Sequence, residues 1–248
     1  MGLQARPGGG LAVAGHTQSA DFPFPPGAHQ KTFGGHWDAI LLELSPDAKE
    51  IRSGTFLGGV GAEFGEHRPS LARDGSFLVS GFEGSEDFPA TTRIAPEVFE
   101  KPGNCFVARY SESGQRIAVV GFGGSNGEFF LMPTEDAAGN IWVVGQTSSD
   151  DFPVTPDALQ PTYGGGDFDG AIVVFDAGLT RILYATYVSG AGNDAVRTVA
   201  PEPDGDVFIV GHTESQNFPL TEGAFQSEIG RRSDGFVARL KLRPGAFD

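Results

Sequence analysis

Short apolar runs, bounded by glycine, proline and polar residues, recur along the whole chain. One set is apolar at every position, which is the pattern of strands covered on both faces. This set occupies residues 11–14, 77–79, 141–144 and 207–210. No segment places its apolar residues at helical spacing over three turns. The pattern therefore predicts an all-β protein.

Three further sets of runs keep a constant order around the first. The second set occupies residues 39–44, 106–110, 171–175 and 236–240, and the third occupies residues 55–57, 118–120 and 185–188. A weaker fourth set precedes the first at residues 3–5, 70–72, 132–134 and 198–200. Asp74-Gly75 and Asp204-Gly205 separate the fourth set from the first, and Asp-Gly is a strong hairpin signal because glycine tolerates positive φ. Each unit is thus predicted to contain four antiparallel strands.

A tripeptide of Asp or Asn, Phe and Pro marks the units as copies of one repeat. It recurs at spacings of 66, 64 and 66 residues, as Asp21-Phe22-Pro23, Asp87-Phe88-Pro89, Asp151-Phe152-Pro153 and Asn217-Phe218-Pro219. A fixed period of this kind is the signature of a repeat architecture. The copies occupy approximately residues 1–59, 60–124, 125–190 and 191–248 of a single predicted domain, 1–248. The second copy carries an insertion that reaches residues 94–100.

Four-stranded units at this period are typical of the blades of a β-propeller, in which stacked sheets bury each other's faces. A β-solenoid has a much shorter period, and a sandwich does not repeat so closely. We therefore expect a β-propeller, either a closed small ring or an arc of a larger propeller. The last copy ends at residues 243–248, where its outer strand is due. We accordingly expect a fragment of a longer protein, with further blades in missing sequence, or a self-associating half-ring.

The residues that the four copies share resemble the pattern of a known repeat family. The elements that carry the resemblance are a Gly-x-Thr-x-Ser-x-Asp-Phe-Pro pattern, Gly223-Ala224-Phe225-Gln226, Asp169-Gly170-Ala171-Ile172-Val173 and Tyr184-Ala185-Thr186-Tyr187. Together they resemble the bacterial β-propeller repeat family abbreviated SBBP. The second copy departs from the pattern at Asn104-Cys105-Phe106. The resemblance implies a propeller in bacterial extracellular or cell-surface proteins, often a non-catalytic module.

Charge and cysteine content narrow the choice of partners. The formal net charge is −15, which repels phosphate backbones and anionic lipid, so neither nucleic acid binding nor membrane insertion is expected. Cys105 is the only cysteine, so no internal disulfide forms. No apolar run is long enough to span a membrane, and residues 1–10 contain no signal peptide.

Three acids in equivalent loops are the candidate binding residues. Glu63, Glu128 and Asp194 stand 24, 23 and 23 residues before the Asp or Asn of the following tripeptide. In a propeller, equivalent loops gather around one mouth of the central channel. A carboxylate ring there could attract a cation or act on a glycoside. Loop solvation and capping of backbone N–H groups is the alternative, which we favour.

The remaining candidates favour structural roles. In the tripeptide, Pro fixes φ, Phe fills an apolar gap, and Asp or Asn caps a turn. His16 and His212 are equivalent, but without a third histidine or a cysteine they make a weak zinc signal. No phosphate loop or nucleophile elbow occurs. We therefore expect no metal and no cofactor.

These observations predict a non-catalytic interaction or scaffold module with a protein or glycan ligand. The alternatives are a carbohydrate-active enzyme (hydrolase or lyase) and a glycan-binding lectin, both using the channel-mouth carboxylates. Two carboxyl groups roughly 5–10 Å apart over an aromatic floor would favour the enzyme.

Overall fold

The computed structural model describes residues 1–94, 104–203 and 205–241. These residues form four sheets and contain no helix, which confirms the all-β prediction. They therefore include no helix that could span a membrane. Part of the second-copy insertion (residues 95–100), Asp204 of the Asp204-Gly205 turn and residues 243–248 lie outside the described residues.

Each of the first two sheets is built from one copy of the repeat. The first sheet has the antiparallel order β1 (Gly2–Ala5), β2 (Leu11–Thr17), β3 (Asp38–Leu44) and β4 (Ile51–Leu57). The second sheet has the antiparallel order β5 (Phe64–Leu71), β6 (Phe77–Glu83), β8 (Asn104–Tyr110) and β9 (Arg116–Phe122). The short β7 (Thr92–Arg93), in the second-copy insertion, adds a parallel strand beside β9.

The third and fourth sheets follow the same plan. The third contains β10 (Glu128–Phe130) and β11 (Thr134–Glu135), which both pair with β12 (Ile141–Thr147), followed by β13 (Asp169–Phe175) and β14 (Ile182–Val188). The fourth sheet has the order β15 (Asp194–Pro201), β16 (Val207–Thr213) and β17 (Asp234–Leu240).

The four predicted sets of strands are confirmed except at one place. The predicted strand 132–134 is wrong in its bounds, because the paired segments β10 and β11 lie on either side of residues 131–133. Pro133 has no N–H to donate to the ladder, so pairing is interrupted there. The hairpin at Asp74-Gly75 is confirmed: Gly75 has a φ of 81°, and its N–H donates to Ala72 O at 3.0 Å.

The core lies between the sheets rather than inside any one of them. Ala12 and Leu41 of the first sheet pack with Phe77 of the second in one buried cluster. Two equivalent clusters lie between the second and third sheets and between the third and fourth sheets. Both faces of the second and third sheets are therefore buried, which explains their continuous apolar runs.

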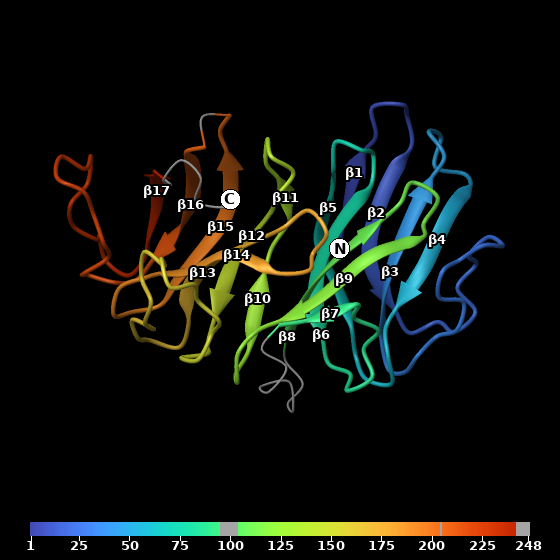
Figure 1. Ribbon diagram of the computed structural model, residues 1–248, viewed down its shortest axis with the longest axis horizontal. Helices are drawn as coiled ribbons and strands as arrows, with labels where there is room; N and C mark the ends of the chain where they lie inside the picture. The colour runs from blue at the N-terminus through green and yellow to red at the C-terminus, as the bar shows by residue number, and fades with distance from the viewer. Residues whose placement is uncertain (95–103, 204, 242–248) are drawn as a thin grey trace.

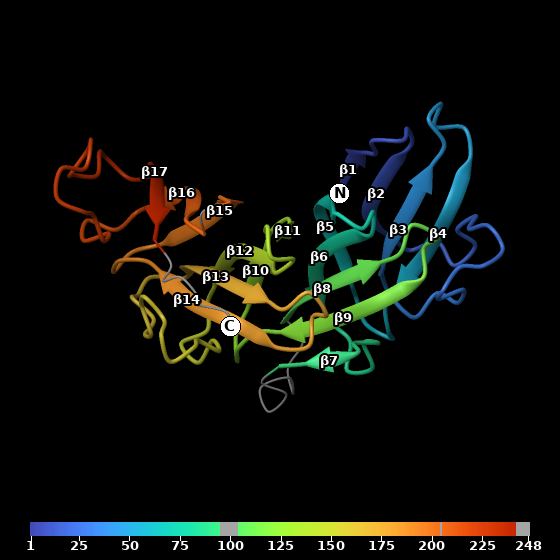
Figure 2. The same cartoon turned by 45° about the horizontal axis from the view of Figure 1, so that its top comes forward.

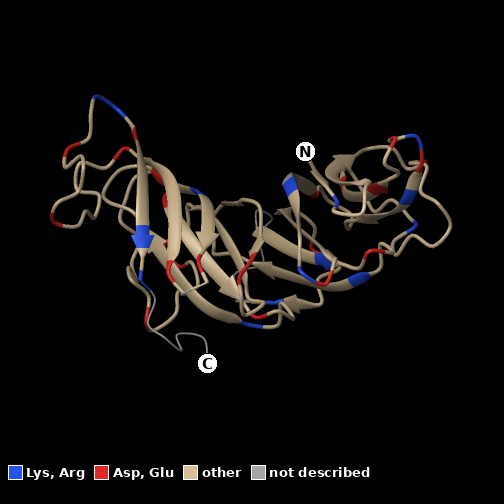
Figure 3. Ribbon diagram, turned by 90° about the horizontal axis from the view of Figure 1, so that it is seen from above, with Lys and Arg blue, Asp and Glu red and all other residues tan. Residues whose placement is uncertain are grey.

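The four sheets follow one another in a curved row (Figures 1 and 2). The sheet of β1–β4 and the sheet of β15–β17 lie at opposite ends of the row in both views. The described residues thus form an open row and not the closed small ring. Acidic and basic residues are scattered along it (Figure 3).

Candidate functional site

The three acids predicted from the sequence all lie where one sheet passes to the next. Glu63 immediately precedes β5, and Glu128 and Asp194 are the first residues of β10 and β15. Their relative exposures are 0%, 5% and 0%, so they are buried rather than solvated. Among the described residues, no three or more His, Cys, Asp or Glu side chains gather in a group that could hold a metal ion. The acids thus occupy three separate junctions.

Each junction is a short loop from the last long strand of one sheet to the first strand of the next. We call residues 58–62 junction one, residues 123–127 junction two and residues 189–193 junction three. At junction three, Gly190 N–H donates to Asp194 Oδ2 at 2.8 Å, and Gly192 N–H donates to Ser215 Oγ at 2.7 Å. Ser215 Oγ in turn donates to Asp194 Oδ2 at 2.6 Å. The acid and the serine therefore hold the loop through its backbone.

The other two junctions repeat this arrangement. At junction one, Ser85 Oγ donates to Glu63 Oε1, and Gly61 N–H donates to Ser85 Oγ at 2.7 Å. At junction two, Ser149 Oγ donates to Glu128 Oε1 at 2.5 Å. These serines stand two residues before the Asp or Asn of the tripeptide. The sequence analysis recognised these serines only as part of the repeat pattern and assigned them no role, although they recur in every copy.

The first residue of the tripeptide completes the junction. Asp87 accepts a hydrogen bond from Val60 N–H, Asp151 from Ser125 N–H and Asn217 from Ala191 N–H, each at 2.8 Å. In each case the acceptor follows the second strand of a sheet, and the donor lies in the junction that leads into that sheet. Asn serves as well as Asp because the loop needs only a side-chain oxygen.

The Phe of the tripeptide fills the gap between neighbouring sheets. Phe88 packs in the cluster between the first and second sheets, and Phe152 in the cluster between the second and third. Phe152 stacks on Phe130, with ring centroids 5.6 Å apart. Phe218 packs against the cluster between the third and fourth sheets. In the first copy, Phe22 packs on the outer face of the first sheet beside Phe56.

A second acid lies beside the first at two of the three junctions. Asp38 begins β3 and Asp169 begins β13, and both are fully buried. Burial raises the pKa of Asp169 to about 6, although N–H groups of the Gly164 loop lower it and neighbouring Asp194 raises it further. Burial also raises the pKa of Asp38 above its ordinary value. The sequence analysis recognised these aspartates only as part of the repeat pattern.

The second copy has a different set of acids at its junction. Asn104 begins β8 where the other copies have Asp, and it pairs across the ladder with Glu83. Arg93 Nη1 in β7 binds Glu83 Oε1 at 2.8 Å. Burial raises the pKa of Glu83 to about 7 in spite of this guanidinium. Burial likewise raises the pKa of Glu128 to about 7, against hydrogen bonds from Ser149 and Thr147.

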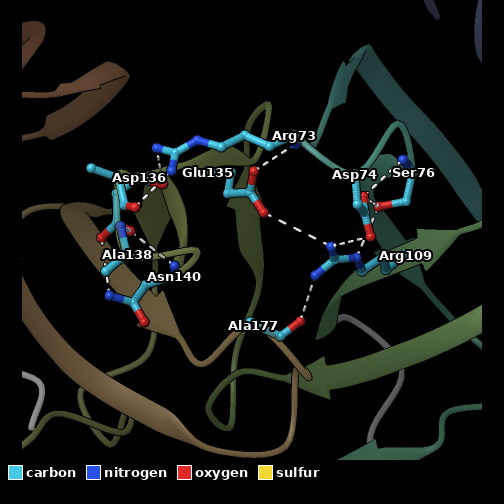
Figure 4. A network of polar contacts seen from close by, with 10 residues as sticks. Arg73, Asp74, Ser76, Arg109, Glu135, Asp136, Ala138, Asn140 and Ala177 are labelled. Atoms are coloured by element: carbon cyan, nitrogen blue, oxygen red, sulfur yellow. Dashed lines mark hydrogen bonds and ion pairs between the residues drawn. The ribbon is translucent and has the colours of Figure 1, made fainter.

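A separate polar network joins the turns at the other end of the second and third sheets (Figure 4). Arg109 Nη2 donates to Asp74 Oδ2 at 2.8 Å, and its Nη1 donates to Ala177 O at 2.7 Å. Arg73 Nη2 donates to Asp136 O at 2.6 Å. These arginines therefore tie three turns together.

The two candidate histidines lie in different sheets and do not meet. His16 in β2 packs edge-on against Trp37 and Phe64. His212 in β16 accepts a 3.4 Å hydrogen bond from Arg197, and burial together with this guanidinium lowers its pKa. Cys105 is fully buried between sheets, and burial raises its pKa.

Comparison with known proteins adds no family to this description. No family model matches the sequence, and no curated protein matches it at the required significance.

Proposed function

We propose that the chain is a non-catalytic interaction and scaffold module, an arc of a β-propeller of SBBP-type repeats. Its fourth sheet pairs with a further strand at the edge of β17. A further sheet of the same repeat packs on the exposed face of the fourth sheet. The observation that carries the proposal is the incomplete state of this sheet. It combines a strand edge that no described strand pairs with and an apolar face that no described sheet covers.

The edge belongs to β17. The equivalent strands β3, β8 and β13 each pair on one edge with the preceding strand of their sheet and on the other with β4, β9 or β14. β17 pairs only with β16 among the described residues. An edge with unpaired N–H and C=O groups is a template for an extended segment of another chain.

The face lies on the side of the fourth sheet away from the third. Phe208, Val210 and Val237 are 37%, 38% and 72% exposed there. Their equivalents in the third sheet include Trp142 and Ile172, which are 2% and 0% exposed because the fourth sheet covers them. A repeat sheet packed in the same way would bury the fourth sheet's face by the same contacts.

A glutamine lies where it could bind a strand added beside β17. In the first sheet, Gln30 Nε2 donates to Gly58 O at 3.0 Å and its Oε1 accepts from Gly58 N–H at 3.3 Å, just beyond β4. In the third sheet, Gln160 Oε1 accepts from Ser189 N–H at 3.0 Å, just beyond β14. Gln30 Nε2 also donates to Asp38 Oδ2 in its own sheet at 3.2 Å, and Gln226 makes the equivalent contact from Nε2 to Asp234 Oδ2 at 2.7 Å. It is therefore oriented for an outer strand beside β17.

The burial of the junction acids supports a scaffold over the hydrolase, lyase and lectin alternatives. A glycosidase needs two carboxyl groups that a sugar can reach. Glu63, Glu128 and Asp194 are at most 5% exposed and bind serines of the same chain. An extracellular or cell-surface location remains part of the proposal through the resemblance alone.

The test is binding of a strand peptide in trans. A fluorescent peptide with the sequence of residues 182–190, which contains β14 and the start of junction three, is titrated against the full chain and followed by anisotropy. We expect saturable one-to-one binding. A control peptide with Thr186→Pro removes a backbone N–H in mid-strand and should not bind.

The matched variant of the chain is Gln226→Ala. Gln226 is exposed, so its loss should leave the melting temperature unchanged and weaken peptide binding about tenfold, as for one lost hydrogen-bonding side chain. Absence of peptide binding, or equal binding of the proline peptide, contradicts the proposal.

A further inference from the structure

Junctions one and three each bury two carboxylates that converge. Asp38, Glu63, Asp169 and Asp194 are all 0% exposed. A Cβ placed on Gly58 would lie 2.5 Å from Asp38 Oδ1 and 2.7 Å from Glu63 Oε2, so these two oxygens approach the same point. Asp194 at junction three is held beside Asp169 as Glu63 is beside Asp38: Asp194 N–H donates to Phe168 O at 3.1 Å, and Glu63 N–H donates to Trp37 O at 2.8 Å. Each pair joins two neighbouring copies of the repeat.

Three oxygens of these pairs lack any donor. Asp38 Oδ1, Asp169 Oδ1 and Asp194 Oδ1 are buried and accept no hydrogen bond. Within residues 1–94, 104–203 and 205–241, the ion pairs involve other acids, and no Lys or Arg binds any of the four. A buried carboxylate oxygen with neither a donor nor a counter-charge is strongly unfavourable.

Junction two has a different acid set, although Glu128 Oε2 and Glu83 Oε2 there also accept no hydrogen bond. There Asn104 replaces the second aspartate, which removes one negative charge. The acid stands instead across the ladder at Glu83, where the other copies have Thr, and Arg93 from the insertion binds it at 2.8 Å. The one junction with a changed acid set thus contains a positive charge of its own, and the two with the standard set contain none among the described residues.

We propose that junctions one and three each bind a divalent cation of the calcium type between their two carboxylates. The paired carboxylates offer oxygen atoms, which Ca²⁺ and Mg²⁺ prefer. Ca²⁺ accepts irregular geometry and gives up water more readily than Mg²⁺. Two carboxylates fill only part of the calcium coordination shell, so backbone carbonyls and water would supply the remaining ligands. The sequence predicted no metal because each copy contributes its acids singly, whereas the pairs form only between copies.

The cation would bind the folded chain alone, so it would stabilise the contact between sheets by mass action. The experiment uses the full chain, freed of metal with a chelator. CaCl₂, MgCl₂ and NaCl at matched ionic strength are compared by calorimetric titration and thermal melting. We expect two calcium sites and a saturable rise in melting temperature that NaCl does not reproduce.

Three variants assign the sites. Asp38→Asn and Asp169→Asn copy the natural Asn104, and each should halve the calcium stoichiometry; the double variant should bind none. Glu128→Gln at junction two is the matched control and should leave both sites intact. Far-ultraviolet circular dichroism reports whether each variant retains its sheets.

A second readout uses the wild-type chain alone. Terbium, a luminescent substitute for calcium, should be sensitised through Trp37, the neighbour of Asp38, and calcium should displace it. The proposal is overturned if calcium does not bind saturably, or if the double variant keeps the stabilisation. It is also overturned if the chelated protein is stabilised only by lowering the pH, since the acid pairs would then share a proton instead.

Discussion

Truncation of one phenylalanine, Phe152→Ala, tests whether the repeated tripeptide holds the sheets together. Phe152 is 3% exposed and lies in the cluster between the second and third sheets. Its ring stacks on Phe130 and meets Tyr187 edge-on, with centroids 6.0 Å apart. Tyr187 Oη also donates to Ser149 O at 2.8 Å, which connects this ring to junction two.

The expected loss of unfolding free energy follows from the removal of a buried ring. A buried Phe→Ala change costs about 3–5 kcal/mol of unfolding free energy, through lost burial and the cavity left behind. For a domain of this size, each kcal/mol lowers the melting temperature by about 2–4 °C. The expected fall is therefore about 6–20 °C. Phe225→Ala is the matched control, because Phe225 is 107% exposed and its loss should change stability by less than about 0.5 kcal/mol.

The assay is equilibrium unfolding in urea, with thermal melting as a second measurement. Binding of the strand peptide to β17 should be unchanged in Phe152→Ala at temperatures where the variant is folded. A variant that melts like the wild type but no longer binds the peptide would refute the structural role of the tripeptide. So would equal effects of Phe152→Ala and Phe225→Ala.

Two further predictions concern the junctions. Asp151→Ala should lower the free energy of unfolding by about 1 kcal/mol, since Ser125 N–H loses its acceptor. The control Asp21→Ala should leave it unchanged, because no described junction precedes the first sheet. Equal losses for the two variants in urea titrations would contradict this prediction. The pKa of Glu128 is raised from 4.5 to about 7, so its contribution is full below pH 4.5 and is lost as the pH rises through about 7. As the pH rises from 4.5 to about 7, the metal-free wild-type protein should therefore lose more unfolding free energy than metal-free Glu128→Gln. If the melting temperatures of the two proteins fall equally over this pH range, Glu128 does not titrate as a buried acid.

The strands could be predicted from the sequence because their signals are local. Continuous apolar runs marked β6, β12 and β16, and Asp-Gly marked the hairpin before β6. The interruption between β10 and β11 was also readable, since Pro133 cannot donate to a ladder. The added strand β7 was not, because two residues in an insertion carry no strand pattern.

The junctions could not be predicted from local pattern, because their partners are far apart in the sequence. Ser149 and Glu128 are 21 residues apart, and Asp151 bonds a loop 26 residues before it. Each residue alone has a sufficient local explanation as a turn or loop residue. Their burial becomes visible only when the sheets are stacked. The same holds for the open row, because closure depends on how sheets pack and not on the pattern within each one.

Hydrogen–deuterium exchange of the isolated full chain tests the central claim, that the edge of β17 is free to accept a strand. Alternate amides of β17 bond to β16, and the others face the edge with which no described strand pairs. We predict that the open-edge amides exchange rapidly, whereas all amides of the equivalent β13 are protected, and that the strand peptide slows exchange at the β17 edge alone. Full protection of β17 in the absence of peptide, or no change when it is added, would contradict the account.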